Sequence, residues 1–362
     1  MKIGITTFQR AHNFGAQMQM YALYTFLKKQ GHDVWILDYY CSPVEDSYLQ
    51  ESFYWRRYIS KNPFRGICRF FKELYGHFTY QRRKVNSFLG FLMDNFKLTE
   101  RFDRAECLPV DFDVMITGSD QLWNYHITHG RKEVYFLDNK QDTENMPRRI
   151  SYAVSVEKDN FHELVEDVDY IKKILSSFNW VSVREQPLAE LLRTRIGVNA
   201  DVAVDPSFFM KVEDCLKIAV KPKEEHFLCV YRVAHTSYLE KLSKKISKER
   251  GLKIVRVYAS ERAVSKAESY GPREILGFLC YSDAVLTSSF HGTVFSIINK
   301  KDFYSAYDFK SVRVYSLLET LGLTDRMLKS FNDYQNLKKI DYNKINFESL
   351  VVESQSKLLK YL

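Results

Sequence analysis

Short apolar runs alternate with longer helical patterns in the first half of the chain. An apolar run at 3–8 is followed by a helical pattern at 16–29 and, after Gly31, by a second apolar run at 34–38. This order predicts a β-α-β unit. The same patterns predict further strands at 113–117, 150–156 and 181–183, and a helix over 164–178. Strands that alternate with helices in this way indicate an α/β domain with a parallel sheet.

A second set of elements follows residues 205–225, where Asp-Pro-Ser and Lys-Pro-Lys break the alternation. The patterns beyond it predict strands at 227–233, 253–258, 284–287 and 303–306, and helices at 238–250, 272–281 and 291–299. We therefore expect an α/β acceptor domain over 1–205, an α/β donor domain over 206–330 and a helical tail over 331–362 that packs back on the first domain. Two such domains enclose a cleft, and ligands of parallel sheets gather at the strand-to-helix junctions.

Composition agrees with a two-domain protein that keeps its thiols reduced. The chain has 362 residues, of which 45% are hydrophobic, and its six cysteines are spread too widely for a zinc knuckle or a disulfide framework. The opening MKIGITTF is a strand pattern and differs from a secretory leader. No apolar stretch is long enough to span a bilayer. We expect a soluble, cytoplasmic protein.

The formal charge of +8 is concentrated in one part of the chain. Nine Lys or Arg residues lie between 53 and 84 against a single acid, Glu73, and aromatic residues separate them. We interpret residues 53–95 as a helical insertion whose aromatics face the core. The alternative is a surface that contacts anionic lipid headgroups at the inner membrane or an acceptor linked to polyprenyl phosphate. Charges elsewhere are mixed, and we expect no nucleic-acid partner.

The first strand-to-helix junction carries the sequence His-Asn-Phe-Gly-Ala-Gln at 12–17. Gly15 lets the backbone turn into the helix and present free N–H groups to an anion. Asn13 and Gln17 add side-chain donors. The alternative for Asn13 is a helix cap without contact to a ligand.

Several polar side chains follow the strand at 113–117. Ser119, Asp120, Gln121, Trp123 and Asn124 combine a hydroxyl, a carboxylate, two amides and an indole within six positions. Sugars are bound by such hydrogen-bonding groups together with an aromatic ring on their apolar face. The alternative is an Asp helix cap with a Trp in the core.

Arg184 ends the strand at 181–183, where its guanidinium is suited to bind a phosphate or carboxylate with two donors. The alternative is a structural ion pair with Glu185 or Asp205.

The densest group of polar residues precedes the helix at 291–299. Ser288, Ser289, His291, Gly292 and Thr293 lie at one helix N-terminus. Free N–H groups at such a terminus favour a phosphate, and His291 is a candidate for proton transfer. The alternative is a hydrogen-bonded core histidine.

His126 and His129 have the spacing of two zinc ligands, but no third ligand stands near them in the sequence. We interpret them as part of a solvated loop and expect no metal.

Six segments resemble, in the same order, the polysaccharide pyruvyl transferase family. They are N-F-G-A-Q-M-Q-M-Y-A-L, G-S-D-Q-L-W-N, S-V-R-E, D-P-S-F-F, Y-G-P-R-E-I-L-G-F-L and S-S-F-H-G-T-V-F-S-I-I-N-K. The resemblance extends to about Arg326. It implies two Rossmann-like domains in a GT-B-like arrangement. It also implies that phosphoenolpyruvate is the donor of a pyruvate ketal on a sugar, with no cofactor.

The resemblance also assigns roles to residues. Arg184 matches the family's strand-end arginine, and His291 matches its histidine before glycine. Some members have an arginine where this chain has Ser289, and Arg313 is a candidate to supply that charge. We expect His291 to protonate the donor's methylene carbon, Arg184 and the helix N-terminus at Gly292 to hold the anion, and Asp120 to act as base.

Two other functions agree with the same fold. One is a GT-B glycosyltransferase that uses a nucleotide sugar, and the other is a non-catalytic glycan-binding homologue. The sugar, its hydroxyl pair and any lipid link are left open by the sequence.

Overall fold

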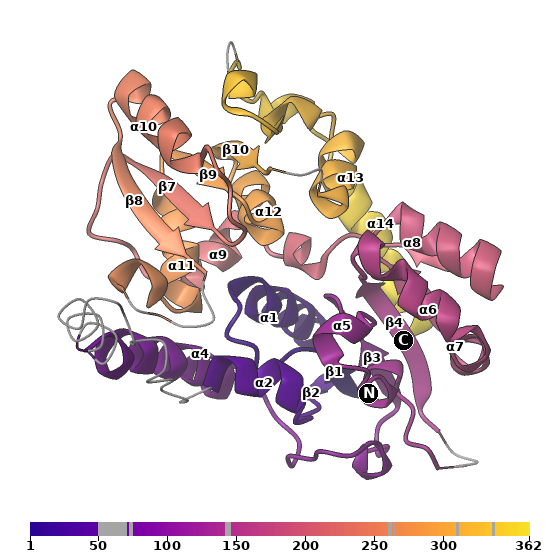
Figure 1. The fold of residues 1–362 in the computed structure, drawn as a ribbon. Helices are drawn as coiled ribbons and strands as arrows, with labels where there is room; N and C mark the ends of the chain where they lie inside the picture. The colour runs from indigo at the N-terminus through magenta and orange to yellow at the C-terminus, as the bar shows by residue number, and fades with distance from the viewer. Residues whose placement is uncertain are drawn as a thin grey trace, which may run out of the picture.

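The chain folds into two α/β units that face each other (Figure 1). The structure is a computed structural model and describes residues 1–49, 71, 75–141, 146–259, 263, 265–308, 311–334 and 337–362. Most of the basic and aromatic stretch at 53–84 lies outside these residues.

The first unit is built on a six-stranded sheet in the order β2-β1-β3-β4-β5-β6. All of its neighbouring strands are parallel. The strands are β1 Lys2–Thr6, β2 Asp33–Ile36, β3 Val114–Thr117, β4 Arg148–Val154, β5 Trp180–Val183 and β6 Asp201–Val202. The strands β3 and β5 are buried along their whole length, which explains their continuous apolar runs. The five strands predicted here are confirmed, whereas β6 is too short to produce a sequence pattern.

The second unit contains a five-stranded parallel sheet in the order β11-β10-β9-β7-β8. Its strands are β7 Phe227–Arg232, β8 Lys253–Tyr258, β9 Ala284–Thr287, β10 Asp302–Ala306 and β11 Met327–Leu328. The four strands predicted in this part are confirmed. The fold class is therefore α/β with two Rossmann-like units, as expected.

Helices cover both sheets and connect the strands. Those used below are α1 Phe14–Lys29, α4 Arg82–Asn95, α5 Tyr125–Thr128, α8 Gln186–Leu191, α11 Pro272–Tyr281, α12 Phe290–Ile298, α13 Val312–Thr320, α14 Glu348–Tyr361 and the 3-10 helix η7 Pro206–Phe209. The single helix expected over 164–178 is divided at Asp167, whose φ of −117° and ψ of 30° interrupt it into α6 Phe161–Glu166 and α7 Val168–Leu175.

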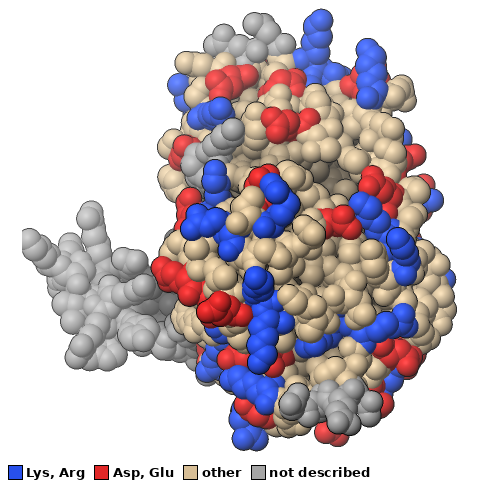
Figure 2. Space-filling model, turned by 90° about the vertical axis from the view of Figure 1, so that its right-hand side faces the viewer, with Lys and Arg blue, Asp and Glu red and all other residues tan. Residues whose placement is uncertain are grey.

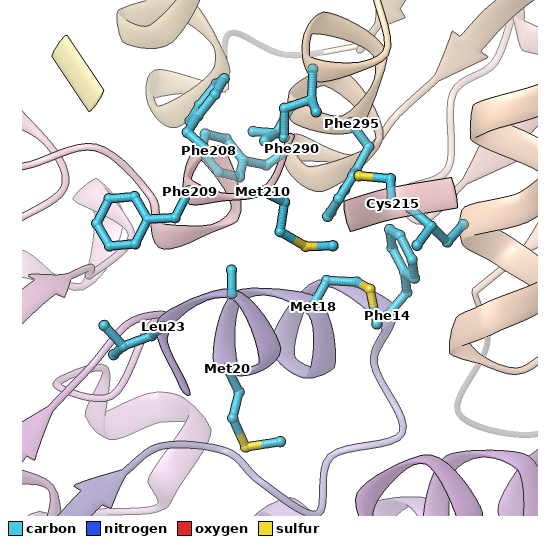
Figure 3. Close-up of a cluster of buried hydrophobic side chains, with 14 of the residues drawn as sticks. Phe14, Met18, Met20, Leu23, Phe208, Phe209, Met210, Cys215, Phe290 and Phe295 are labelled. Atoms are coloured by element: carbon cyan, nitrogen blue, oxygen red, sulfur yellow. The ribbon is translucent and has the colours of Figure 1, made fainter. Parts of the chain in front are cut away.

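The helix α1 lies between the two units and is buried by both (Figure 1). The Phe14 ring packs 5.3 Å from Phe295 of the second unit, and Phe26 packs 4.7 Å from Phe209 of η7. Figure 3 shows Phe14 and Met18 of α1 in one cluster with side chains of η7 and α12. One hydrophobic core therefore extends across both units, and each fully buried large side chain in it contributes roughly 1.5–3 kcal/mol.

The helix α4 is the last part of the insertion predicted at 53–95, and its side chains contact α11 of the second unit. Its Arg83 pairs with Glu274, and its Asp94 lies 3.4 Å from Arg273. On its other side, Phe88 and its apolar neighbours are buried. This part of the insertion faces the core.

The C-terminal helix α14 lies against the edge of the first sheet. The Tyr361 ring stacks on Trp180 with 5.2 Å between centroids, and the Val204 amide donates to Ser354 Oγ over 3.1 Å. The last helix thus closes the sheet edge at β5 and β6.

Basic and acidic side chains are interspersed over the face shown in Figure 2. Among the described residues, no helix combines the length and apolarity needed to cross a bilayer.

Candidate active site

A cleft of about 650 Å³ opens between the two units, as the two-domain arrangement predicts. It lies at the carboxyl ends of strands of both sheets, where ligands of parallel sheets bind. The predicted site residues that line it are Asn13, Asp120, Gln121, Ser288, Ser289, His291 and Arg313.

The N-terminus of α12 places His291 at the cleft. Ser289 caps this helix, because its Oγ accepts a hydrogen bond from the Gly292 amide over 3.2 Å. Thr287 Oγ1 accepts from the Ser289 amide over 3.0 Å and fixes the turn from β9 into the helix. His291 therefore stands in the first helical turn, where free N–H groups favour an anion.

Each nitrogen of the His291 ring has a neighbouring protein group. The Nε2 atom is 3.5 Å from Asp205 Oδ2. On the other side, a Cβ placed on Gly15 would stand 2.0 Å from Nδ1. The glycine at position 15 is thus needed to make room for the imidazole. The sequence predicted only that Gly15 allows the backbone to turn into the helix.

Arg184 lies in a buried network with Ser119 and Asp205. Its Nη2 donates to Ser119 Oγ over 2.6 Å and lies 2.7 Å from Asp205 Oδ2. Its guanidinium carbon is 5.0 Å from the centre of the Phe290 ring. The structural alternative for Arg184, an ion pair with Asp205, is therefore present. Nevertheless, its Nε and Nη1 have no hydrogen-bond partner within the described part of the chain.

Burial and charge oppose each other in this network. Burial alone would raise the pKa of Asp205, but Arg184 and His291 hold it well below its usual range. Burial likewise lowers the pKa of Arg184, and the carboxylates of Asp205 and Glu185 more than reverse this, so the pKa lies above its usual value. Both groups are therefore charged throughout the neutral range.

Asp205 is the functional residue that sequence reasoning missed, since it was considered only as a partner of Arg184. It starts η7, where its Oδ1 accepts from the Ser207 amide over 2.8 Å. The Asp-Pro-Ser sequence is the signal of this cap. The capping role explains why an aspartate stands at position 205. That its carboxylate also lies beside His291 can be seen only in the tertiary structure.

Arg313 reaches from α13 to the first unit. Its Nε lies 3.2 Å from Glu157 Oε2, which also lines the cleft. Arg313 and Glu157 therefore form an ion pair in the cleft wall, and Ser289 serves as a helix cap.

Buried polar atoms without a hydrogen-bond partner are concentrated in this region. Among the described residues, seven such side-chain atoms belong to this region, namely Arg184 Nε and Nη1, Glu185 Oε2, Asp205 Oδ2, Ser207 Oγ, His291 Nε2 and Arg313 Nε. Three of these, on Asp205, His291 and Arg313, are still within ion-pair distance of an opposite charge. Such a group of unsatisfied atoms is expected where a polar ligand binds.

Asn13 and Asp120 line the cleft from the first unit. Asn13 caps α1, because its Oδ1 accepts from the amides of Gly15 and Ala16 at 2.8 and 3.3 Å, and the residue also lines the cleft. Asp120 has a φ of 88°, and its Oδ1 accepts from the Gln121 amide over 2.9 Å.

The prediction that Trp123 covers the apolar face of a sugar is wrong. Its side chain is fully buried, stacks 4.9 Å from Phe136 and donates from Nε1 to the Tyr135 carbonyl over 3.1 Å. Asn124 is also buried and caps α5 by accepting from the His126 amide. The chain turns inward after Gln121, so these two residues belong to the core.

Three further residues predicted to bind substrate contact other parts of the protein instead. Gln17 Nε2 donates to the carbonyls of Gln9 and Ala11 and holds the loop before α1. Thr293 is fully buried and its hydroxyl bonds to Ser305 over 2.7 Å. Gly292 packs on Thr287, where an added Cβ would stand 2.3 Å from the hydroxyl oxygen.

His126 lies in the short helix α5, and His129 follows it in a left-handed conformation. Among the described residues, no three His, Cys, Asp or Glu side chains come together in a way that could hold a metal ion.

Two solved structures align with nearly the whole chain at low sequence identity. The UDP-GlcNAc 2-epimerase of Methanocaldococcus jannaschii aligns with a TM-score of 0.49 and 10% identity over 100% of both chains. A putative UDP-N-acetylglucosamine 2-epimerase of Listeria monocytogenes aligns with a TM-score of 0.48 and 11% identity over 99% of this chain and 90% of its own. Comparison with curated proteins gives no significant match.

The family comparison is informative about function. The model of the family described as polysaccharide pyruvyl transferase matches residues 13–307, which include most strands of both sheets and every predicted cleft residue except Arg313. The ordered motifs and this match agree, and the chain belongs to the polysaccharide pyruvyl transferase family.

Proposed function

We propose that this transferase moves a pyruvyl group from phosphoenolpyruvate onto two hydroxyls of one sugar and so forms a cyclic ketal. The sugar belongs to a surface polysaccharide or to its lipid-linked precursor, and the reaction takes place in the cytoplasm. The observation that supports this most directly is the group of unsatisfied buried atoms around Arg184.

A small dianionic donor fits the chemistry of that group. Phosphoenolpyruvate carries a phosphate and a carboxylate, and the Nε and Nη1 of Arg184, which have no hydrogen-bond partner among the described residues, can each donate to such an anion. Arg313 and the N-terminus of α12 offer a second point of attachment.

The first unit supplies groups suited to a sugar acceptor. Asn13, Asp120 and Gln121 present amide and carboxylate groups to the cleft. A cleft of about 650 Å³ lies within the usual size of ligand sites and can hold a saccharide beside the donor.

The reaction requires proton transfers in both directions. A proton is added to the donor's methylene carbon, and the first sugar hydroxyl attacks the resulting cation at C2. Phosphate then leaves, and the second hydroxyl closes the ring. One of the two hydroxyl protons restores the acid that protonated the methylene carbon. The other leaves with the phosphate. Arg184 and Arg313 hold the donor, while His291 and Asp120 exchange protons with the hydroxyls.

The experiment combines the purified protein with phosphoenolpyruvate and a panel of free and lipid-linked sugars. Phosphate release together with a product of ketal mass is the expected result. Both should be lost in Arg184→Ala and His291→Ala and retained in Arg193→Ala, which removes an exposed arginine from the same unit.

Donor binding is tested separately by thermal unfolding. Phosphoenolpyruvate should raise the Tm, whereas UDP and GDP should not, because a ligand stabilises only the state that it binds. Stabilisation by a nucleotide alone would instead indicate a nucleotide-sugar glycosyltransferase. Binding of saccharide without any donor turnover would indicate a glycan-binding homologue.

A further inference from the structure

A second cavity of about 380 Å³ lies next to the cleft. It is enclosed by α13, α14, the end of β6 and the start of α8, and it shares Phe290 and Arg313 with the main cleft. Arg184 and Glu185 both line it. The two cavities therefore meet at Phe290 and Arg313, and Arg184 lines the second cavity but not the main cleft.

Glu185 directly follows Arg184 and is 4% exposed. The Ser155 hydroxyl donates to its Oε1 over 2.8 Å. Its Oε2 is buried and has no hydrogen-bond partner among the described residues. One oxygen is thus fixed in place, and the other is buried at the cavity wall without a partner among the described residues.

The charged groups around Glu185 come from three elements. Arg184 precedes it at the end of β5, Arg313 comes from α13, and Glu157 follows β4. Burial raises the pKa of Glu185 to about 7, although both arginines act in the opposite direction. On the α14 side of the cavity, Glu353 is partly exposed and pairs with Lys357 over 3.0 Å.

In the proposed reaction His291 exchanges protons with the sugar hydroxyls. Its Nδ1 lies against Gly15, which leaves Nε2, beside Asp205, for that exchange. The reaction removes a proton from a sugar hydroxyl and adds a proton to the methylene carbon of the donor. It therefore needs a second group, besides the base, that holds a proton.

We propose that Glu185 is that group, the general acid that delivers a proton to the methylene carbon of the enolpyruvyl donor. This inference rests on the proposed function. The Glu185 O–H bond breaks as the new C–H bond forms, and the electron pair of the C=C bond makes that bond and leaves C2 electron-poor for the sugar hydroxyl. The hydroxyl proton passes to His291 and returns through solvent to the Glu185 carboxylate. The second hydroxyl proton leaves with phosphate.

The test compares Glu185→Gln with wild type. Glutamine keeps the size of the side chain and an acceptor for Ser155 but has no acidic proton. We expect kcat for ketal formation to fall at least ~100-fold, the typical effect of losing a general acid. Stabilisation of the protein by phosphoenolpyruvate should remain unchanged. The decline of the wild-type kcat above about pH 7 should disappear from any residual activity.

Glu353→Gln is the matched control, because it makes the same change on the opposite wall of the same cavity. It should leave kcat and its pH dependence unchanged. If Glu185→Gln does not fold, Glu185→Asp replaces it. The aspartate keeps an acid one methylene further from the donor, so we expect reduced kcat with the decline at high pH retained.

Three outcomes overturn the inference. The first is a wild-type kcat in Glu185→Gln. The second is weaker donor binding at unchanged kcat, which would make Glu185 a residue that only positions the arginines. The third is a kcat for Glu185→Asp without the decline at high pH. Absence of ketal formation by wild type with every acceptor would instead reject the proposed function itself.

Discussion

The imidazole of His291 lies against the α-carbon of Gly15, so close that a methyl group on that carbon would stand 2.0 Å from Nδ1. The two residues belong to the first turns of α12 and α1, in different units of the protein. This contact sets the position of the histidine relative to the first unit's side of the cleft.

Replacing Gly15 with alanine should therefore displace His291. Because a shift of about 1 Å in a catalytic group can reduce the rate ~100-fold, we expect a loss of that order in kcat. Steady-state kinetics of ketal formation measure it, and circular dichroism checks the fold.

Gly90→Ala is the control for this substitution. Gly90 also lies in a helix, α4, but an added Cβ meets nothing within 4 Å. Its activity should equal that of wild type. Equal activity of Gly15→Ala would show that the position of His291 does not limit the reaction.

Asp205→Asn should reduce both stability and activity. The amide still accepts from the Ser207 amide but leaves the buried Arg184 without its counter-charge, and such a loss destabilises a protein by ~3 kcal/mol or more. Denaturant unfolding at neutral pH measures the change. Asp201→Asn, which alters a more exposed ion pair with Lys357, should change the free energy of unfolding by less than ~1 kcal/mol.

The same variant should respond differently to acid. The pKa of Asp205 is lower in the folded than in the unfolded chain, where it is about 3.9. Its ion pairs therefore stabilise the wild type fully above about pH 4, and this stabilisation is lost as the pH falls below that value. Asp205→Asn lacks this contribution, so its stability should fall less steeply in that range. Parallel curves for the two proteins would contradict the assignment.

Glu185 should produce the opposite trend near neutral pH. Its pKa is about 7 in the folded protein and about 4.3 in the unfolded chain. Between these values the folded protein keeps a proton that the unfolded chain has lost, so the free energy of unfolding decreases as the pH rises from about 5 to about 7. Glu185→Gln should remove this component of the slope, and Glu353→Gln should retain it. Unfolding curves at a series of pH values distinguish the two.

Trp123→Phe should weaken the fold without affecting the acceptor. Phenylalanine keeps an aromatic ring beside Phe136 but loses part of the buried area and the hydrogen bond to Tyr135, so we expect a destabilisation of ~1–3 kcal/mol. The KM for the sugar should be unchanged. A large increase in KM at unaltered stability would restore the sugar-binding interpretation.

Hydrophobic periodicity determined the α/β class and nearly all strands of both sheets, because the buried strands of a parallel sheet produce apolar runs that are visible in the sequence. The two strands that were missed, β6 and β11, have two residues each. The ordered motifs determined the family, and they directed attention to Arg184 and His291, which the structure brings together around Asp205.

Tertiary structure alone decided which polar residues face the cleft. The sequence around 119–124 has the composition of a sugar site, yet Asp120 and Gln121 line the cleft while Trp123 and Asn124 are buried. A loop can point its side chains either way, and only its packing against β3 and Phe136 selects the direction. Asp205 likewise meets Arg184 and His291 because α1, η7 and α12 share one core, which is a contact between distant segments that no local pattern encodes.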